Sequence, residues 1–96
     1  FRVVYPFDRV PEPLWEKGWH DVAAHEIGHT WARGLSTEQR QVYAGIRGQA
    51  GFNGEDYADV FAAIVGGVGR GGLAYIGTPP PADQVEAICA ARLMPC

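Results

Sequence analysis

Hydrophobic residues recur every three or four positions between residues 19 and 33, which is the spacing of one face of an α-helix. The stretch contains no proline, and Gly34 follows it as a stop signal. We therefore predict a helix over this range. Its apolar back face, which should pack against the rest of the molecule, consists of Ala23, Ala24, Ile27 and Trp31. The opposite face carries His25 and His29.

A second apolar stripe recurs at helical spacing between residues 57 and 68. It consists of Tyr57, Val60, Phe61, Ile64, Val65 and Val68. Glu55 and Asp59 are four residues apart and lie on the opposite side, among alanines. We predict a helix over 55–65 that packs by one face and presents two carboxylates from the other. Because Gly28 and these alanines are small, the two predicted helices can approach each other closely.

Two shorter helices are predicted in the rest of the chain. Ser36 and Gln39 form a capping-box pattern, so a helix should follow them and run to about Arg47. A last helix over residues 82–93 has apolar residues at helical spacing on one side. The fold class is therefore mainly α, with α+β as the alternative, in a single domain that spans residues 1–96.

The remaining segments predict little sheet. Residues 2–5 contain β-branched and aromatic side chains, and we predict a short strand there. Residues 73–76 are predicted to form either a short strand or an extended segment. Pro11 and Pro13 predict an extended loop ahead of the first helix. We thus expect about four helices with one or two short strands.

Composition narrows the range of partners. The 96 residues, of which 47% are hydrophobic and 20% charged, are typical of a globular domain with one modest core. The net charge is −3 and no basic cluster is present, which argues against nucleic acid and anionic membranes as partners. No apolar run reaches the ~18 residues of a membrane span. We expect a monomer.

Cys89 and Cys96 are the two cysteines of the chain. The turn at Pro95 would let them close a short disulfide loop, which would stabilise the fold by about 2–3 kcal/mol in the chain-entropy model. The alternative is two unpaired thiols, one buried on the last helix and one at a frayed end. A bridge would favour an oxidising compartment and hence a secreted or cell-surface location.

His25, Glu26 and His29 form an HExxH pattern within the first predicted helix. Residues four apart lie about 40° apart around a helix axis, so the two imidazoles can bind one metal ion. Glu26 lies one step around the helix, where it can take a proton from an activated water. This pattern indicates metal-assisted hydrolysis, most often of a peptide bond. The alternative is an amphipathic helix that carries two histidines by chance.

A hydrolytic zinc site uses a third protein ligand and leaves the fourth position open. No histidine follows His29, so the third ligand must be a carboxylate or a thiolate. Glu55 can be that ligand. Asp59, one turn later, can accept a hydrogen bond from the other nitrogen of a ligand histidine and fix its tautomer. The alternative for Glu55 and Asp59 is a solvated acidic face near a helix start.

The HExxH pattern followed by Glu55-x-x-x-Asp59 resembles the gluzincin branch of the zincin metallopeptidases, and the chain is similar in size to the minigluzincins. The resemblance covers about residues 19–66. It implies Zn²⁺ bound by His25, His29 and Glu55, with Glu26 as general base and Asp59 supporting a ligand histidine. The function it implies is zinc-dependent hydrolysis of peptide bonds in a peptide or protein substrate.

Such an enzyme also needs a group that stabilises the oxyanion of the transition state. Gluzincins often use a downstream histidine or tyrosine. Here Tyr75 and Tyr43 are the candidates for this role, and Arg47 and Arg70 are further ones. A peptidase usually holds its substrate along a sheet edge, and the predicted strands are short.

Two other hypotheses remain open for the chain as a whole. The first is a non-catalytic zincin-like module, in which zinc stabilises a small core and the surface binds a protein partner. The second is a helical interaction domain without metal. Zinc content separates the second from the others, and hydrolysis separates the enzyme from the module.

Overall fold

The computed structural model describes residues 12–96, with side chains described from Asp21 onward. Within this range the chain forms four α-helices, a short 3₁₀ helix and no strand. The elements are α1 (Glu12–Arg33), α2 (Thr37–Arg47), α3 (Gly54–Ile64), η2 (Arg70–Gly72) and α4 (Ala82–Ala90). The prediction of a mainly-α fold with about four helices is confirmed.

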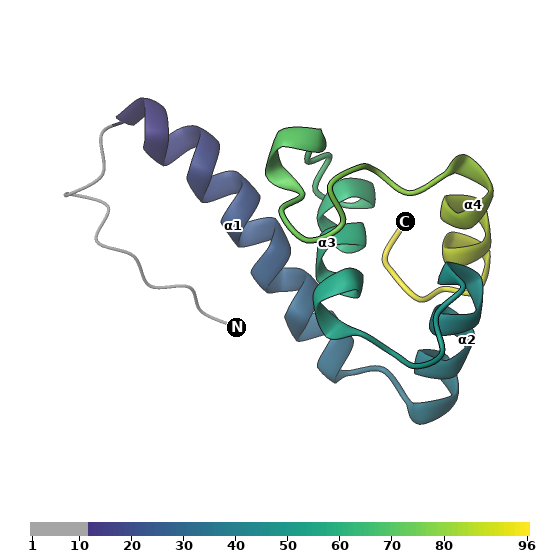
Figure 1. Ribbon diagram of the computed structural model, residues 1–96. Helices are drawn as coiled ribbons and strands as arrows, with labels where there is room; N and C mark the ends of the chain where they lie inside the picture. The colour runs from purple at the N-terminus through teal and green to yellow at the C-terminus, as the bar shows by residue number, and fades with distance from the viewer. Residues whose placement is uncertain (1–11) are drawn as a thin grey trace.

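Helix α3 lies at the centre of the described part of the chain. Figure 1 shows α1 along one side of α3, and α2 and α4 together on the other side. The C-terminal tail, in yellow, turns back from α4 towards α3. Helix α3 therefore packs by two faces, one against α1 and one against α2, α4 and the tail.

Helix α1 begins at Glu12, well before the predicted start at residue 19. Pro13 therefore lies in the first turn of the helix, and the prediction of an extended loop there was wrong. A proline is tolerated in a first turn because the N–H that it lacks would have no acceptor within the helix. Pro11 and the strand predicted over residues 2–5 lie outside the described residues.

Helices α1 and α3 approach each other through very small residues. A Cβ built on Gly28 would lie 2.8 Å from the Cα of Ala58 and 2.9 Å from its carbonyl oxygen, too close for any side chain. The close approach predicted from Gly28 and the alanines is confirmed. Ala24 and Ala32, one turn to either side of Gly28, are also buried and extend this face of α1.

The predicted back face of α1 is only partly right. Ala24 is buried, but Ile27 and Trp31 are 39% and 41% exposed. Because the helices touch through glycine and alanine, the larger apolar side chains fall on the flank of the contact. The Trp31 ring still reaches α3 from there, with its centroid 6.1 Å from that of Phe61.

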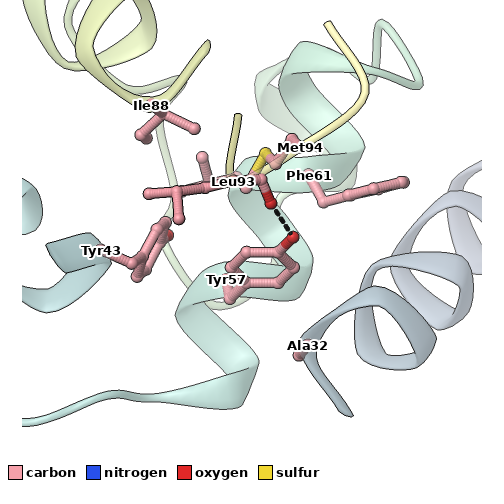
Figure 2. Packing of buried hydrophobic residues seen from close by; sticks show 8 residues of the cluster. Ala32, Tyr43, Tyr57, Phe61, Ile88, Leu93 and Met94 are labelled. Carbon is pink, nitrogen blue, oxygen red and sulfur yellow. Dashed lines mark hydrogen bonds between the residues drawn. The ribbon is translucent and has the colours of Figure 1, made fainter. Parts of the chain in front are cut away.

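The main core lies between α3, α2, α4 and the C-terminal tail. Figure 2 shows Tyr57 of α3 beside Tyr43 of α2, with Leu93 of the tail above both rings and Ile88 of α4 above Leu93. The Tyr57 hydroxyl donates a hydrogen bond to the carbonyl of Leu93, and burial raises the pKa of Tyr57 to about 12. The tail is thus a structural part of the core.

The apolar stripe predicted for α3 is confirmed in its first half, where Tyr57, Val60 and Phe61 are buried. The helix ends at Ile64, just before the glycine-rich segment, and Val65 is 40% exposed. Val68 lies beyond the helix and is buried in a second, smaller cluster with Ala24 and Leu73.

The two short helices and the cysteine pair agree closely with prediction. The capping box at the start of α2 is complete, since Ser36 and Gln39 each accept the other's backbone N–H. Helix α4 ends at Ala90 and not at residue 93, because Arg92 adopts a left-handed conformation with φ 56°. Cys89 and Cys96 form a disulfide, which excludes the two unpaired thiols.

Residues 74–76 form a turn, so the prediction of a short strand or an extended segment over 73–76 was wrong. The described range contains no strand to pair with this segment. The backbone N–H groups of Tyr75 and Ile76 donate instead to the carboxylate of Asp59 on α3. Among residues 12–96, no helix is both long and apolar enough to cross a membrane.

Candidate metal centre

Helices α1 and α3 bring the three predicted ligand side chains together. His25 and His29 lie one turn apart on α1, and Glu55 lies in the first turn of α3. Asn53 fixes the start of α3, because its Oδ1 accepts hydrogen bonds from the backbone N–H groups of Glu55 (2.9 Å) and Asp56 (3.3 Å). The cap and the close helix contact therefore hold Glu55 opposite the two histidines.

The three side chains form a compact triangle of nitrogen and oxygen atoms. His25 Nε2 lies 3.0 Å from His29 Nε2 and 3.1 Å from Glu55 Oε2, and His29 Nε2 lies 3.0 Å from Glu55 Oε1. The imidazoles are largely buried, whereas the Glu55 side chain is 54% exposed. The cluster is therefore covered by α1 on one side and exposed to solvent on the side of Glu55.

Asp59 orients the first of the two histidines. Its Oδ1 lies 2.7 Å from His25 Nδ1, and its Oδ2 accepts the backbone N–H groups of Tyr75 (2.7 Å) and Ile76 (3.0 Å). A carboxylate is an acceptor, so the proton of this contact belongs to His25 Nδ1. In a neutral imidazole the lone pair is then on Nε2, which faces the cluster.

While the Glu55 carboxylate is ionised, protons cannot satisfy all three edges of the triangle. With His25 neutral and its proton on Nδ1, only one proton, on His29 Nε2, is available for three contacts. If both imidazoles were charged, two N–H groups would face each other across the 3.0 Å edge. A cation that contacts all three side chains at once would satisfy every edge. The three side chains are therefore arranged so that they could hold a cation.

The donor set fits zinc. Four ligands at the usual zinc bond lengths of about 2.0–2.1 Å form a tetrahedron with edges of roughly 3.3–3.4 Å. In the protein the two imidazole nitrogens are 3.0 Å apart, and they lie 3.1 and 3.0 Å from the Oε2 and the Oε1 of Glu55, respectively. Two imidazoles and one carboxylate are also the protein ligands of one class of catalytic zinc site, which leaves a fourth position open. A thiolate ligand is excluded for Cys96, which is in the disulfide.

Glu26 lines a pocket of about 450 Å³ that opens beside the cluster. The pocket is lined by Asp21, Val22, His25, Glu26, Glu55, Asp59, Gly72, Ala74 and Tyr75. The Glu26 side chain is half-buried, and no hydrogen bond joins its carboxylate to any other described residue. Its oxygens are therefore available to a molecule bound in the pocket, next to the two imidazoles.

Tyr75 is the predicted transition-state stabiliser that the structure brings to the site. It lines the same pocket as Glu26, and its side chain is 55% exposed. Its backbone N–H holds Asp59, and its hydroxyl oxygen accepts a hydrogen bond of 2.7 Å from Asn53 Nδ2. Both ends of this residue are therefore tied to α3 and its N-cap, the helix that carries Glu55.

Tyr43 is not brought to the site, and the structure removes it from the candidates. It is fully buried in the core, where its hydroxyl donates to Asp56 Oδ2 at 2.7 Å. Burial and this hydrogen bond raise the pKa of Tyr43. Arg47 is committed to the same carboxylate through Nε and Nη2, and exposed Arg70 does not line the pocket.

Sequence reasoning missed two contributions to the site. The first is the pair of backbone N–H groups at residues 75 and 76 that hold Asp59, which no side-chain pattern encodes. The second is Asn53, whose place just before the first turn of a predicted helix is the signal of a cap. That signal would have identified its Oδ1 bonds but not its contact with Tyr75.

Comparisons with protein-family models, with curated proteins and with solved structures found no match to this chain. The resemblance to gluzincins is therefore carried by the HExxH pattern, Glu55 and Asp59 alone. The function has to be argued from the chemistry of these side chains and their surroundings.

Proposed function

We propose that the protein is a zinc-dependent peptide-bond hydrolase. The observation that supports this most strongly is the triangle formed by His25, His29 and Glu55, whose three edges cannot all be satisfied by protons while the Glu55 carboxylate is ionised. The ligands would be these three side chains. Glu26 would be the general base, in a pocket large enough for part of a peptide.

The protein side chains would divide the reaction between them. When bound, zinc supplies a Lewis acid that polarises a carbonyl group and makes water a stronger acid. The Glu26 carboxylate would take a proton from the attacking water and pass it to the leaving amine. Tyr75 would donate a hydrogen bond from its hydroxyl to the oxygen of the reacting carbonyl, while Asp59 keeps His25 in one tautomer.

The second candidate function is a non-catalytic zinc-binding module. One observation favours it: residues 12–96 contain no strand whose edge could hold an extended peptide by main-chain hydrogen bonds. In such a module the ion would tie α1 to α3, and the surface would bind a protein. The two functions share their metal ligands and differ only in whether Glu26 and Tyr75 act on a substrate.

The decisive experiment is the variant Glu26→Gln. We expect it to retain one zinc per chain by elemental analysis and to lose at least about 100-fold in the hydrolysis of a peptide library, because a neutral amide cannot take a proton from water. The control Glu86→Gln changes an exposed carboxylate on α4 and should leave both measurements unchanged.

Each other outcome selects one of the remaining hypotheses. A wild-type chain that binds zinc without any turnover would be the non-catalytic module. A wild-type chain that contains no zinc after exposure to the metal would leave only a helical interaction domain. Equal turnover by wild type and Glu26→Gln would disprove the role of Glu26.

A further inference from the structure

Asn53 joins the metal ligand Glu55 to Tyr75 through the two ends of one amide group. Its Oδ1 accepts from the first N–H groups of α3, those of Glu55 and Asp56. Because the oxygen is used by these two donors, the nitrogen must face the other way. There Nδ2 donates to the Tyr75 hydroxyl oxygen at 2.7 Å. The hydrogen bonds therefore fix which end of the amide faces Tyr75.

This polarity decides what the Tyr75 hydroxyl can do. A hydroxyl group has one proton to donate and lone pairs that accept. The Asn53 contact occupies a lone pair, so the hydroxyl keeps its proton for an acceptor elsewhere. Tyr75 is 55% exposed and lines the pocket that contains Glu26 and His25, where that acceptor would be found.

We propose that Asn53 is a positioning residue that aims the Tyr75 hydroxyl proton at the carbonyl oxygen of a bound peptide. The inference rests on the proposed hydrolase function. It adds that the helix cap beside Glu55 also sets the direction of the oxyanion donor. The Asn53 side chain would thus fix the position of Glu55 relative to the Tyr75 hydroxyl.

The test is the variant Asn53→Ser, since serine caps a helix about as well as asparagine but has no amide to reach Tyr75. We expect kcat to fall about 10-fold while KM and zinc affinity stay within about two-fold of wild type. Tyr75→Phe should lose about 100-fold in kcat, the usual cost of removing one oxyanion donor. The double variant should be no slower than Tyr75→Phe alone, because Asn53 acts through the hydroxyl.

A binding measurement provides a readout that does not depend on turnover. The zinc-loaded variants would be titrated with a phosphinic peptide, whose tetrahedral oxygens imitate the transition state. We expect Asn53→Ser to weaken this binding about 10-fold and the cleavage product to bind as it does to wild type. In Asn53→Asp the cap is kept but the donor becomes an acceptor, so the Tyr75 proton would turn inward and the loss should be larger.

Three outcomes would overturn the proposal. Asn53→Ser could keep wild-type kcat and phosphinic-peptide affinity. The double variant could show a loss in kcat equal to the product of the losses of Asn53→Ser and Tyr75→Phe. Asn53→Ser could lose zinc affinity in step with kcat, which would mean that Asn53 acts only through the cap and Glu55. None of these outcomes would contradict the proposed hydrolase function. That proposal is contradicted if the zinc-loaded wild type shows no turnover.

Discussion

Two consecutive carboxylates of α3, Glu55 and Asp56, belong to two different regions of the molecule. Glu55 faces α1, where its oxygens meet two imidazole nitrogens at 3.0 and 3.1 Å. Asp56 faces α2, where it accepts hydrogen bonds from Arg47 Nε (2.9 Å), Arg47 Nη2 (2.8 Å) and the Tyr43 hydroxyl (2.7 Å). Neighbouring residues of a helix point about 100° apart, which is enough to separate the two regions.

The two regions differ in whether each close contact between polar atoms has a proton to make it a hydrogen bond. Every contact of Asp56 has a donor, because a guanidinium and a phenol offer protons to a carboxylate. The triangle of His25, His29 and Glu55 has fewer protons than edges. The Asp56 contacts are therefore satisfied by the protein alone, whereas the contacts around Glu55 are those that the proposed cation would complete. Two neighbouring carboxylates of one helix thus meet different partners, a guanidinium and a phenol in one place and two imidazoles in the other.

The largest effect that separates the two regions is expected from Asp56→Ala. Removing one partner of a largely buried ion pair leaves Arg47 and Tyr43 without their acceptor and should lower the free energy of unfolding by about 3 kcal/mol. The measurement is urea unfolding of the zinc-free protein. We expect the folded fraction of this variant to bind zinc with wild-type affinity.

Glu55→Ala is the matched control and should behave in the opposite way. It removes a half-exposed side chain that contributes little to packing, so the zinc-free protein should unfold within about 0.5 kcal/mol of wild type. Zinc affinity, measured by competition with a chelating dye, should fall by more than about 10-fold, the lower end of what the loss of an outer-sphere partner alone costs. Equal effects of the two variants on stability and on zinc affinity would contradict the division into two regions.

The sequence predicted the Glu55 region better than the Asp56 region, for a physical reason. Metal ligands have to match a fixed geometry, and the spacing of His25 and His29 on one helix already satisfies part of it. An ion pair such as that of Asp56 with Arg47 has no local requirement, since it depends on how two helices pack. Asp56 and Arg47 are nine residues apart across a loop, and no pattern in that loop indicates the pairing.

The predictions that failed did so where tertiary contacts override local preference. The segment 73–76 has strand propensity, but the Asp59 carboxylate takes the N–H groups that a strand would use for pairing. Tyr43 was proposed for its hydroxyl, but its ring is fully buried in the core, so packing and not catalysis accounts for its position. Pro13 was misinterpreted because a proline disfavours a helix interior but not its first turn.

A smaller effect, confined to the Glu55 region, is expected from Gly28→Ala. The new methyl group would lie 2.8–2.9 Å from backbone atoms of Ala58, which cannot move without shifting α3. We expect a loss of about 2 kcal/mol in stability, and also weaker zinc binding, because the histidines would move away from Glu55. Thermal unfolding and zinc titration would measure the two effects.

Gly45→Ala is the control for this substitution. Gly45 lies in α2, the helix that contributes Arg47 and Tyr43 to the Asp56 region. A Cβ added to Gly45 would meet no atom within 4 Å. The alanine should therefore stabilise the helix by up to about 1 kcal/mol and leave zinc affinity unchanged. A Gly28→Ala variant with wild-type zinc affinity would show that the triangle does not depend on the close contact of α1 with α3.

The smallest expected effect is a pH dependence that belongs to the Asp56 region. Burial alone would raise the pKa of Asp56, but the hydrogen bonds from Arg47 and Tyr43 together outweigh burial and hold that pKa below its usual value. The carboxylate therefore stabilises the fold fully above the pKa of the unfolded chain, near 3.9, and this stabilisation is lost as the pH falls towards the lower folded-state pKa.

Asp56→Asn tests this dependence, because it keeps the shape of the side chain and removes its titration. Unfolding would be followed between pH 2.5 and 6 in the presence of a chelator, so that release of metal does not contribute. The stability difference between wild type and variant should be largest above about pH 4 and should shrink in stronger acid. A difference that stays constant over the whole range would mean that the Arg47 and Tyr43 contacts do not favour the ionised carboxylate. The contrast with the Glu55 region would then rest on geometry alone.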